Sequence, residues 1–222
     1  MQVPNGGSHR VGRLPARLAL DHITVVDATP LQLADAAFQA GFAAICPFLH
    51  SLDVMSAMPA YDMVTDLALR ARFIEQLETL NLQVDVAYPF TLSKRTIVSE
   101  FKETLACAKE VKASFANVLL YDRDAESRQT NFARFCDLAQ GFGLRTVVEF
   151  YPASQIRNLE EAFQLAASIG DPTVAGLNVD ILHVLRSGGA IADILAIPPE
   201  YIAYAQFSDG PAHSTRGLCG RG

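Results

Sequence analysis

The sequence predicts an α/β fold built from parallel βαβ units, and it favours an incomplete (β/α)8 barrel with about seven units. Two observations carry this prediction. Short apolar runs alternate with longer amphipathic stretches at a spacing of roughly 30 residues, which is typical of parallel strands joined by helices. Polar residues also occur toward the C-terminal ends of several runs, where the active sites of such barrels are built.

The predicted strands are seven short runs rich in apolar and β-branched residues. Their near-continuous apolar character is typical of strands that are covered on both faces. The runs are 18–26, 43–49, 83–88, 116–121, 145–151, 174–182 and 201–207.

Helix signals stand between these runs. Thr29, Pro30 and Gln32 form a capping signature, and the helix that follows is predicted to end at Gly41. A second helix is predicted over 66–80. Later helices are indicated by a cap or by apolar residues at helical spacing: Phe101, Leu105, Ala108 and Val111; Phe132, Phe135, Cys136 and Ala139; Asn158 with Glu161; and 191–195.

The barrel is favoured over an open doubly wound sheet. No GxGxxG or GxxxxGK[ST] pattern follows any run, which weakens the nucleotide-binding versions of the open sheet. The barrel lacks an eighth unit, because the 13 residues after Asp209 include four Gly and one Pro. We therefore predict a barrel of the TIM type over 17–209, an irregular or disordered extension over 1–16, with a transit peptide as the alternative, and an irregular tail over 210–222.

Composition restricts the class of protein. The chain has 222 residues and a formal net charge of −6, which argues against a nucleic-acid partner. No apolar run approaches the roughly 20 residues of a membrane helix, so we expect a cytoplasmic protein without a membrane partner. The four cysteines form no CxxC pair and are expected to be reduced thiols. A missing barrel unit would expose strand edges, which predicts a homo-oligomer.

The sharpest local pattern is the run Asn178–His183, in which Asp180 and His183 stand at the end of the sixth predicted strand. Glu149 lies one unit earlier and Gln206 lies in the seventh strand. Their oxygens suit Mg²⁺ or Mn²⁺, with imidazole tolerated. A carboxylate in a run as apolar as VVEFY is costly unless it is paired or metal-bound, so Glu149 requires a partner.

Structural roles are the alternative for each of these residues. Glu149 could pair with Arg145 or Arg157, Asp180 could cap the turn after its strand, and His183 could be a satisfied structural histidine.

Several segments together resemble the sugar phosphate isomerase/epimerase family, the xylose isomerase-like TIM barrels, from about Leu18 to Gly210. They are HITVVDATPLQLADAAFQAGFAAI, VVEFYP followed by Arg157, NVDILHVLRSGG and YIAYAQFSDGP. The resemblance implies that Glu149, Asp180 and Gln206 are ligands of a divalent metal, which would be Mg²⁺ or Mn²⁺, or else Zn²⁺ or Co²⁺. It also implies that His183 contacts the substrate or the outer metal sphere.

Two departures from the family pattern matter. Gln206 stands where epimerases usually have His. A Gln at this position resembles members of the family that are similar to 3-dehydroshikimate dehydratases. The strand-eight Glu of the family has no counterpart, as expected of a truncated chain.

The function implied is a metal-dependent sugar or sugar phosphate isomerase or epimerase that moves a proton next to a carbonyl through an enediolate. Glu149 and His183 are the candidate catalytic residues. His183, Arg157, Asp85 and Tyr88 are candidate contacts for a small-molecule substrate, and for Asp85 and Tyr88 strand-end position is the only argument. A dehydratase acting on a cyclic keto acid and a truncated barrel without activity are the alternatives.

Overall fold

The structure is a computed structural model that describes residues 18–208. The extension predicted over 1–16 and the tail predicted over 210–222 lie outside the described residues, as do Asp209 and Cys219. The strands are β1 (Ala19–Asp21), β2 (Ala44–Cys46), β3 (Gln83–Val84), β4 (Val86–Leu92), β5 (Phe115–Leu120), β6 (Arg145–Glu149), β7 (Ala175–Asp180) and β8 (Ile202–Gln206).

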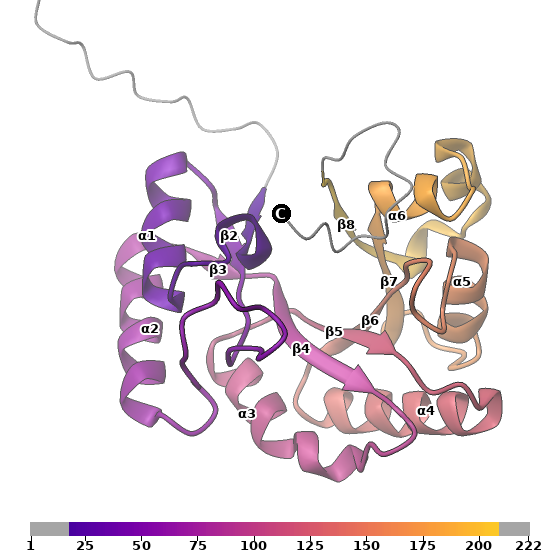
Figure 1. Cartoon of the computed structure of the whole chain (residues 1–222), viewed down its shortest axis with the longest axis horizontal. Coiled ribbons are helices and arrows are strands. Elements are labelled where there is room, and N and C mark those ends of the chain that lie inside the picture. Colours follow the sequence, from indigo (N-terminus) through magenta and orange to yellow (C-terminus); the bar gives the residue numbers. More distant parts are fainter. Residues whose placement is uncertain (1–17, 209–222) are drawn as a thin grey trace, which may run out of the picture.

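The α-helices lie on the outer side of the strands (Figure 1). They are α1 (Pro30–Ala40), α2 (Leu67–Leu80), α3 (Lys102–Glu110), α4 (Ala125–Gly141), α5 (Leu159–Ala167) and α6 (Ile181–Arg186). Short 3-10 helices cover η1 (His22–Val25), η2 (Val98–Phe101), η3 (Ile191–Ala196) and η4 (Pro199–Tyr201).

All strand ladders are parallel, as the alternating pattern predicts. One sheet has the order β1-β2-β3 and the other the order β4-β5-β6-β7-β8. Only Asp85 separates β3 from β4, and a parallel bridge between Phe48 and Tyr88 continues the pairing onto β4. The strands therefore occupy seven positions, and β1 and β8 are the two ends of the series. The seven predicted strands and the parallel α/β class are confirmed.

The predicted helix signals act as expected. The Gln32 amide donates to Thr29 Oγ1 (3.3 Å), while Gln32 Oε1 accepts from the Thr29 amide (2.8 Å). Gly41 ends α1 in the left-handed region, with φ of 81°. Asn158 Oδ1 caps α5 by accepting from the Glu161 amide (2.9 Å).

Two of the overlong predicted strands end early in the structure for the same reason. The first run leaves the strand at Asp21, because the Asp21 carboxylate accepts from the Ile23 amide and starts η1. The sixth run leaves it at Asp180, whose carboxylate accepts from the Leu182 and His183 amides and starts α6. In each case an N-cap aspartate turns an apolar run into helix.

Apolar side chains form two clusters. The larger one fills the layer between the strands and the surrounding helices and includes Phe73, Phe132 and Phe135. The smaller one groups side chains of β2 and β4 with partly buried residues of β1, β5 and β8, and it includes Phe48 and Tyr88. The strands are therefore covered on both faces, as their apolar character predicts.

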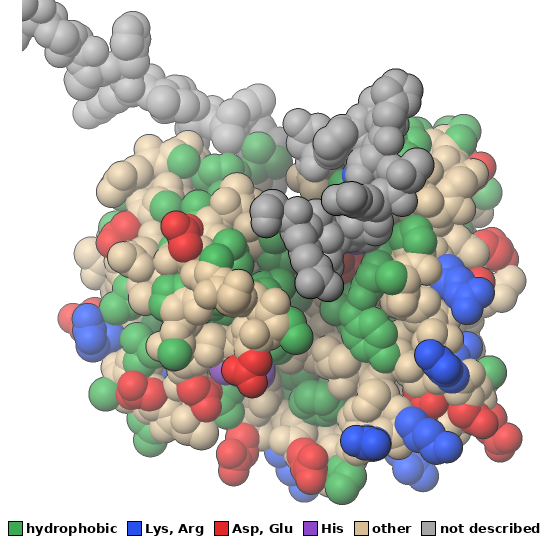
Figure 2. Space-filling view, viewed as in Figure 1, with side chains coloured by type: hydrophobic (Ala, Val, Ile, Leu, Met, Phe, Trp, Pro, Cys, Tyr) green, Lys and Arg blue, Asp and Glu red, His purple; other side chains and the backbone are tan. Residues whose placement is uncertain are grey.

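Charged side chains of both signs are interspersed around the face shown in Figure 2. Within residues 18–208, no helix is long and apolar enough to cross a membrane. Cys46, Cys107 and Cys136 are buried free thiols. The homo-oligomer stays a prediction.

Candidate active site

Polar side chains of neighbouring strands meet at the C-terminal ends of β6, β7 and β8. Glu149 pairs in register with Asn178, and Asp180 pairs with Gln206. Because alternate residues of a strand share a face, Asn178 and Asp180 lie on the same side of β7. The sequence prediction that these residue types meet at one end of the barrel agrees with this register.

Glu149 has two neighbours. Its Oε2 accepts a hydrogen bond from Asn117 Nδ2 (2.6 Å), and its Oε1 lies 3.5 Å from His183 Nε2. The side chain is 17% exposed. The partners that this carboxylate requires are therefore an amide and an imidazole. Arg145, which the sequence offered as an alternative partner, instead donates from its guanidinium to the Glu200 carbonyl oxygen.

Asp180 caps a helix and also lies beside His183. Its Oδ1 caps α6, and both of its oxygens accept from Ser208 Oγ (3.0 and 2.8 Å). Its Oδ2 lies 3.9 Å from His183 Nε2. The capping role foreseen as the alternative is thus present, and it leaves the carboxylate beside the imidazole.

His183 is buried between the two carboxylates. Its Nε2 faces both Glu149 and Asp180, and its ring lies 5.7 Å from the ring of Tyr151. Its Nδ1 is buried and has no hydrogen-bond partner among the described residues. An imidazole nitrogen left in that state is unusual, since buried polar groups are nearly always paired.

Gln206 forms its hydrogen bonds with residues of β1, β4 and β7. Its Nε2 donates to Asp21 Oδ2 (3.0 Å) and to Tyr88 Oη (2.7 Å), and its Oε1 accepts from Asn178 Nδ2 (2.9 Å). Tyr88 Oη in turn donates to Asp21 Oδ2 (3.1 Å).

These contacts form one continuous set of hydrogen bonds, which we call the interior network. From β1 to β6 its members are Asp21, Tyr88, Gln206, Asn178, Asn117 and Glu149. Asn178 Nδ2 also donates to Asn117 Oδ1 (3.0 Å), which joins the two halves. Sequence reasoning missed Asp21, Asn117 and Asn178 as site residues. The available signal was a polar residue inside each apolar run, which costs free energy without a partner.

The predicted metal ligands fit a divalent cation only in part. Glu149 and Asp180 offer carboxylate oxygens on either side of a buried imidazole, which are donors that such ions accept. Gln206 does not join them, because its amide is bonded to Asp21, Tyr88 and Asn178. Within residues 18–208, no group of three or more His, Cys, Asp or Glu side chains is placed to hold a metal ion.

The predicted substrate contacts fall in different places. Tyr88 belongs to the interior network. Arg157 is exposed, and its backbone amide donates to Glu161 (2.9 Å). Asp85 does not lie toward the C-terminal end of its strand as predicted, because the strand continues to Leu92. Asp85 lies instead beside the start of β5, where its carbonyl oxygen accepts from the Phe115 amide.

His22, which directly follows the end of β1, has a structural role. Its Nε2 donates to the Ala28 carbonyl oxygen (2.9 Å), and its Nδ1 accepts from the Phe48 amide (3.2 Å). Burial lowers the pKa of this imidazole. Both ring nitrogens are therefore occupied in the neutral form.

Asp21 has a raised pKa. Burial raises its pKa to about 6, with a smaller contribution from the charge of Glu149, against hydrogen bonds from Ile23, Tyr88 and Gln206. Because the folded pKa lies above the ordinary value of 3.8, folding favours the protonated carboxyl.

The stabilising contribution of Asp21 is therefore expected to be present below about pH 4 and to be lost as the pH rises through about 6. Relative to an Asp21→Asn variant, the wild-type protein should lose on the order of 1–3 kcal/mol of unfolding free energy across that range. Urea denaturation of both proteins at several pH values measures the difference. A difference that does not change with pH would contradict the prediction.

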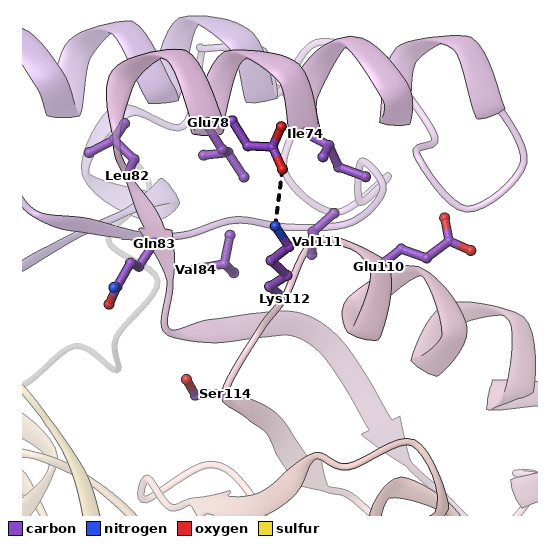
Figure 3. A pocket seen from close by; sticks show the side chains of 10 residues that line it. Ile74, Glu78, Leu82, Gln83, Val84, Glu110, Val111, Lys112 and Ser114 are labelled. Atoms are coloured by element: carbon purple, nitrogen blue, oxygen red, sulfur yellow. Dashed lines mark hydrogen bonds and ion pairs between the residues drawn. The ribbon is translucent and has the colours of Figure 1, made fainter.

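A pocket of about 330 Å³ lies on another part of the molecule (Figure 3). It is lined by residues of α2, β3 and the end of α3, and the ion pair between Glu78 and Lys112 (3.0 Å) crosses it. Gln83 and Ser114 place it at the N-terminal ends of the strands, whereas Glu149 is at the C-terminal end of β6. This pocket is separate from the interior network.

Comparisons with known proteins identify the fold. No protein-family model and no curated protein sequence matches the chain. Among solved structures, the IolI protein with a bound zinc atom matches at a TM-score of 0.68 and 16% identity, over 88% of this chain and 75% of that one. The probable 3-dehydroshikimate dehydratase AsbF from Bacillus anthracis matches at 0.65 and 16%, over 86% and 72%. D-Psicose 3-epimerase matches at 0.69 and 12%, over 90% and 76%.

The chain also spans 31% of the length of a fusion protein that joins a xylose isomerase-like TIM barrel to a 4-hydroxyphenylpyruvate dioxygenase. At these low identities the likeness establishes the fold. The chain has the fold of the xylose isomerase-like TIM barrels, and the resemblance seen in the sequence is confirmed at that level.

Proposed function

We propose that this chain is an isomerase or epimerase that transfers a proton at the carbon next to a carbonyl group. The observation that carries the proposal is the setting of Glu149. One carboxylate oxygen is held by Asn117, and the other faces the buried His183 imidazole. A carboxylate with one oxygen fixed and the other directed at a second titratable group is suited to general base catalysis.

The reaction follows from this arrangement. Glu149 removes a proton from the carbon beside the carbonyl, and the electron pair moves onto the carbonyl oxygen to give an enediolate. His183 Nε2 is placed to hydrogen-bond to that oxygen and to stabilise its charge. Return of the proton to the neighbouring carbon gives an isomer, and protonation of the same carbon by solvent from the opposite face gives an epimer.

A divalent cation is part of the proposal. Held by Glu149 and Asp180, Mg²⁺, Mn²⁺, Zn²⁺ or Co²⁺ would polarise the substrate carbonyl. Support comes from the carboxylates on either side of His183 and from the bound zinc atom named for IolI.

The charges around the site favour an uncharged sugar. Asp21, Glu149 and Asp180 bring three carboxylates to this region, and within residues 18–208 no Lys or Arg nitrogen contacts any of them. A phosphate or a carboxylate on the substrate would meet like charge there. A free ketose is therefore a better fit than a sugar phosphate or a cyclic keto acid.

The test is a substrate panel in heavy water. The full chain with added Mn²⁺ is incubated with a free ketohexose, its phosphate ester and 3-dehydroshikimate, and the products are analysed by mass spectrometry. We expect an isomer of the free ketose that has gained deuterium from the solvent. Loss of water from 3-dehydroshikimate would instead identify a dehydratase. No deuterium uptake with any compound would overturn the proposal.

A further inference from the structure

We propose that Gln206 is a positioning residue that joins the two ends of the strand series, and that it is not a metal ligand. The inference deepens the proposed function, because it concerns how the same site is held in place. It rests on the contacts of the Gln206 amide, on the place of Gln206 in the fold and on the hydrogen bonds that connect it to Glu149.

The hydrogen-bonding groups of the Gln206 amide already have partners. Its two N–H groups are matched by two acceptors, Asp21 Oδ2 and Tyr88 Oη, and its oxygen accepts from Asn178 Nδ2. A cation at that oxygen would lie close to the positive end of the Asn178 amide. Ligation would therefore oppose a hydrogen bond that is already formed in the barrel interior.

The site side chains separate into two groups. Asp180 contacts both Ser208 and His183, and His183 lies beside Glu149. Gln206 contacts Asp21, Tyr88 and Asn178 instead, although it pairs in register with Asp180 on the neighbouring strand. The Gln206 amide therefore forms no hydrogen bond with either of the two carboxylates proposed to bind the cation.

The place of Gln206 in the fold gives this amide its structural role. It ends β8, the last strand, and its Nε2 bonds to Asp21, which ends β1. No ladder joins these two strands among residues 18–208. A side-chain hydrogen bond therefore connects edges that backbone hydrogen bonds do not connect.

Hydrogen bonds connect Gln206 to Glu149, the proposed catalytic base. Asn178 donates to Gln206 and to Asn117, and Asn117 donates to Glu149. Asn117 and Asn178 are 1% and 0% exposed, so water cannot readily replace these bonds. Gln206 is thereby connected to Glu149 through Asn178 and Asn117, and Asn117 remains the direct donor to the Glu149 carboxylate when the Gln206 amide is removed.

The experiment compares Gln206→Met and Gln206→His with the wild-type chain. The zinc dissociation constant is measured by titrating zinc chloride in competition with a chromophoric chelator. The melting temperature is measured without metal. Methionine keeps the length and removes the amide, whereas histidine would be the stronger zinc ligand. We expect both variants to melt about 5–10 °C lower. We also expect their zinc dissociation constants to stay within about threefold of wild type.

Three control proteins separate this proposal from the proposed function. Gln39→Met alters an exposed glutamine of α1 and should leave both readouts unchanged. Glu149→Gln and Asp180→Asn should weaken zinc binding at least about tenfold. If these two variants bind zinc like wild type, the cation part of the proposed function fails, while the melting temperatures still test the role of Gln206.

Either of two results would overturn the assignment of Gln206. One is a loss of zinc affinity of about tenfold or more in Gln206→Met, or a comparable gain in Gln206→His. The other is an unchanged melting temperature in both variants, which would show that the amide does not join the strand ends.

Discussion

Glu149→Gln is expected to lower turnover of a free ketose by about 10²–10⁴-fold while the protein stays folded, because the amide cannot accept the substrate proton. Glutamine keeps the shape of the side chain, and its oxygen can still accept from Asn117 Nδ2. Because the same substitution is expected to weaken cation binding, the assay uses saturating Mn²⁺, and the loss should then appear in kcat more than in KM. Steady-state kinetics and a melting curve of the same preparation measure the two effects.

The matched control is Glu160→Gln on α5. Glu160 is exposed and its carboxylate accepts from Gln164 on the same helix, so turnover should not change. Turnover of Glu149→Gln within about threefold of the wild-type value would remove Glu149 from the mechanism.

Asn117→Leu is expected to have the largest effect on stability, about 2–4 kcal/mol of unfolding free energy, because it removes hydrogen bonds from two polar side chains of the barrel interior. Glu149 Oε2 loses its donor, and Asn178 Nδ2 loses one of its two acceptors. Urea denaturation measures the change.

A double-mutant cycle with Asn178→Leu checks the cause. Because the two asparagines bond to each other, the double variant should lose about 1 kcal/mol less than the sum of the single variants. The exposed Gln129 of α4 supplies a control, since Gln129→Leu should change stability by less than about 0.5 kcal/mol. Strict additivity of Asn117→Leu and Asn178→Leu would contradict the interior network.

Local signals in the sequence were sufficient for the elements of the fold. The Thr29–Gln32 capping box, the Gly41 helix end and the Asn158 cap each act through residues within a few positions of one another. Such contacts can be predicted because the chain itself brings the partners together. The spacing of apolar runs likewise predicted seven parallel strand positions.

Errors arose where a single side chain competes with the apolar pattern. The periodicity extended two strands beyond Asp21 and Asp180, although each aspartate caps the helix that follows. It also placed Asp85 too close to a strand end, because the strand continues through Pro89 to Leu92. Apolar runs do not by themselves show where a strand gives way to a helix.

By itself the sequence determined the parallel α/β class, the strand count, the helix caps and the polar residues available at the strand ends. Only the tertiary structure decided which of those residues touch. Gln206 lies 185 residues from Asp21 and bonds to it, while Glu149 receives its hydrogen bond from Asn117 on the neighbouring strand. Barrel curvature and strand register set these contacts, and both depend on the packing of the whole chain.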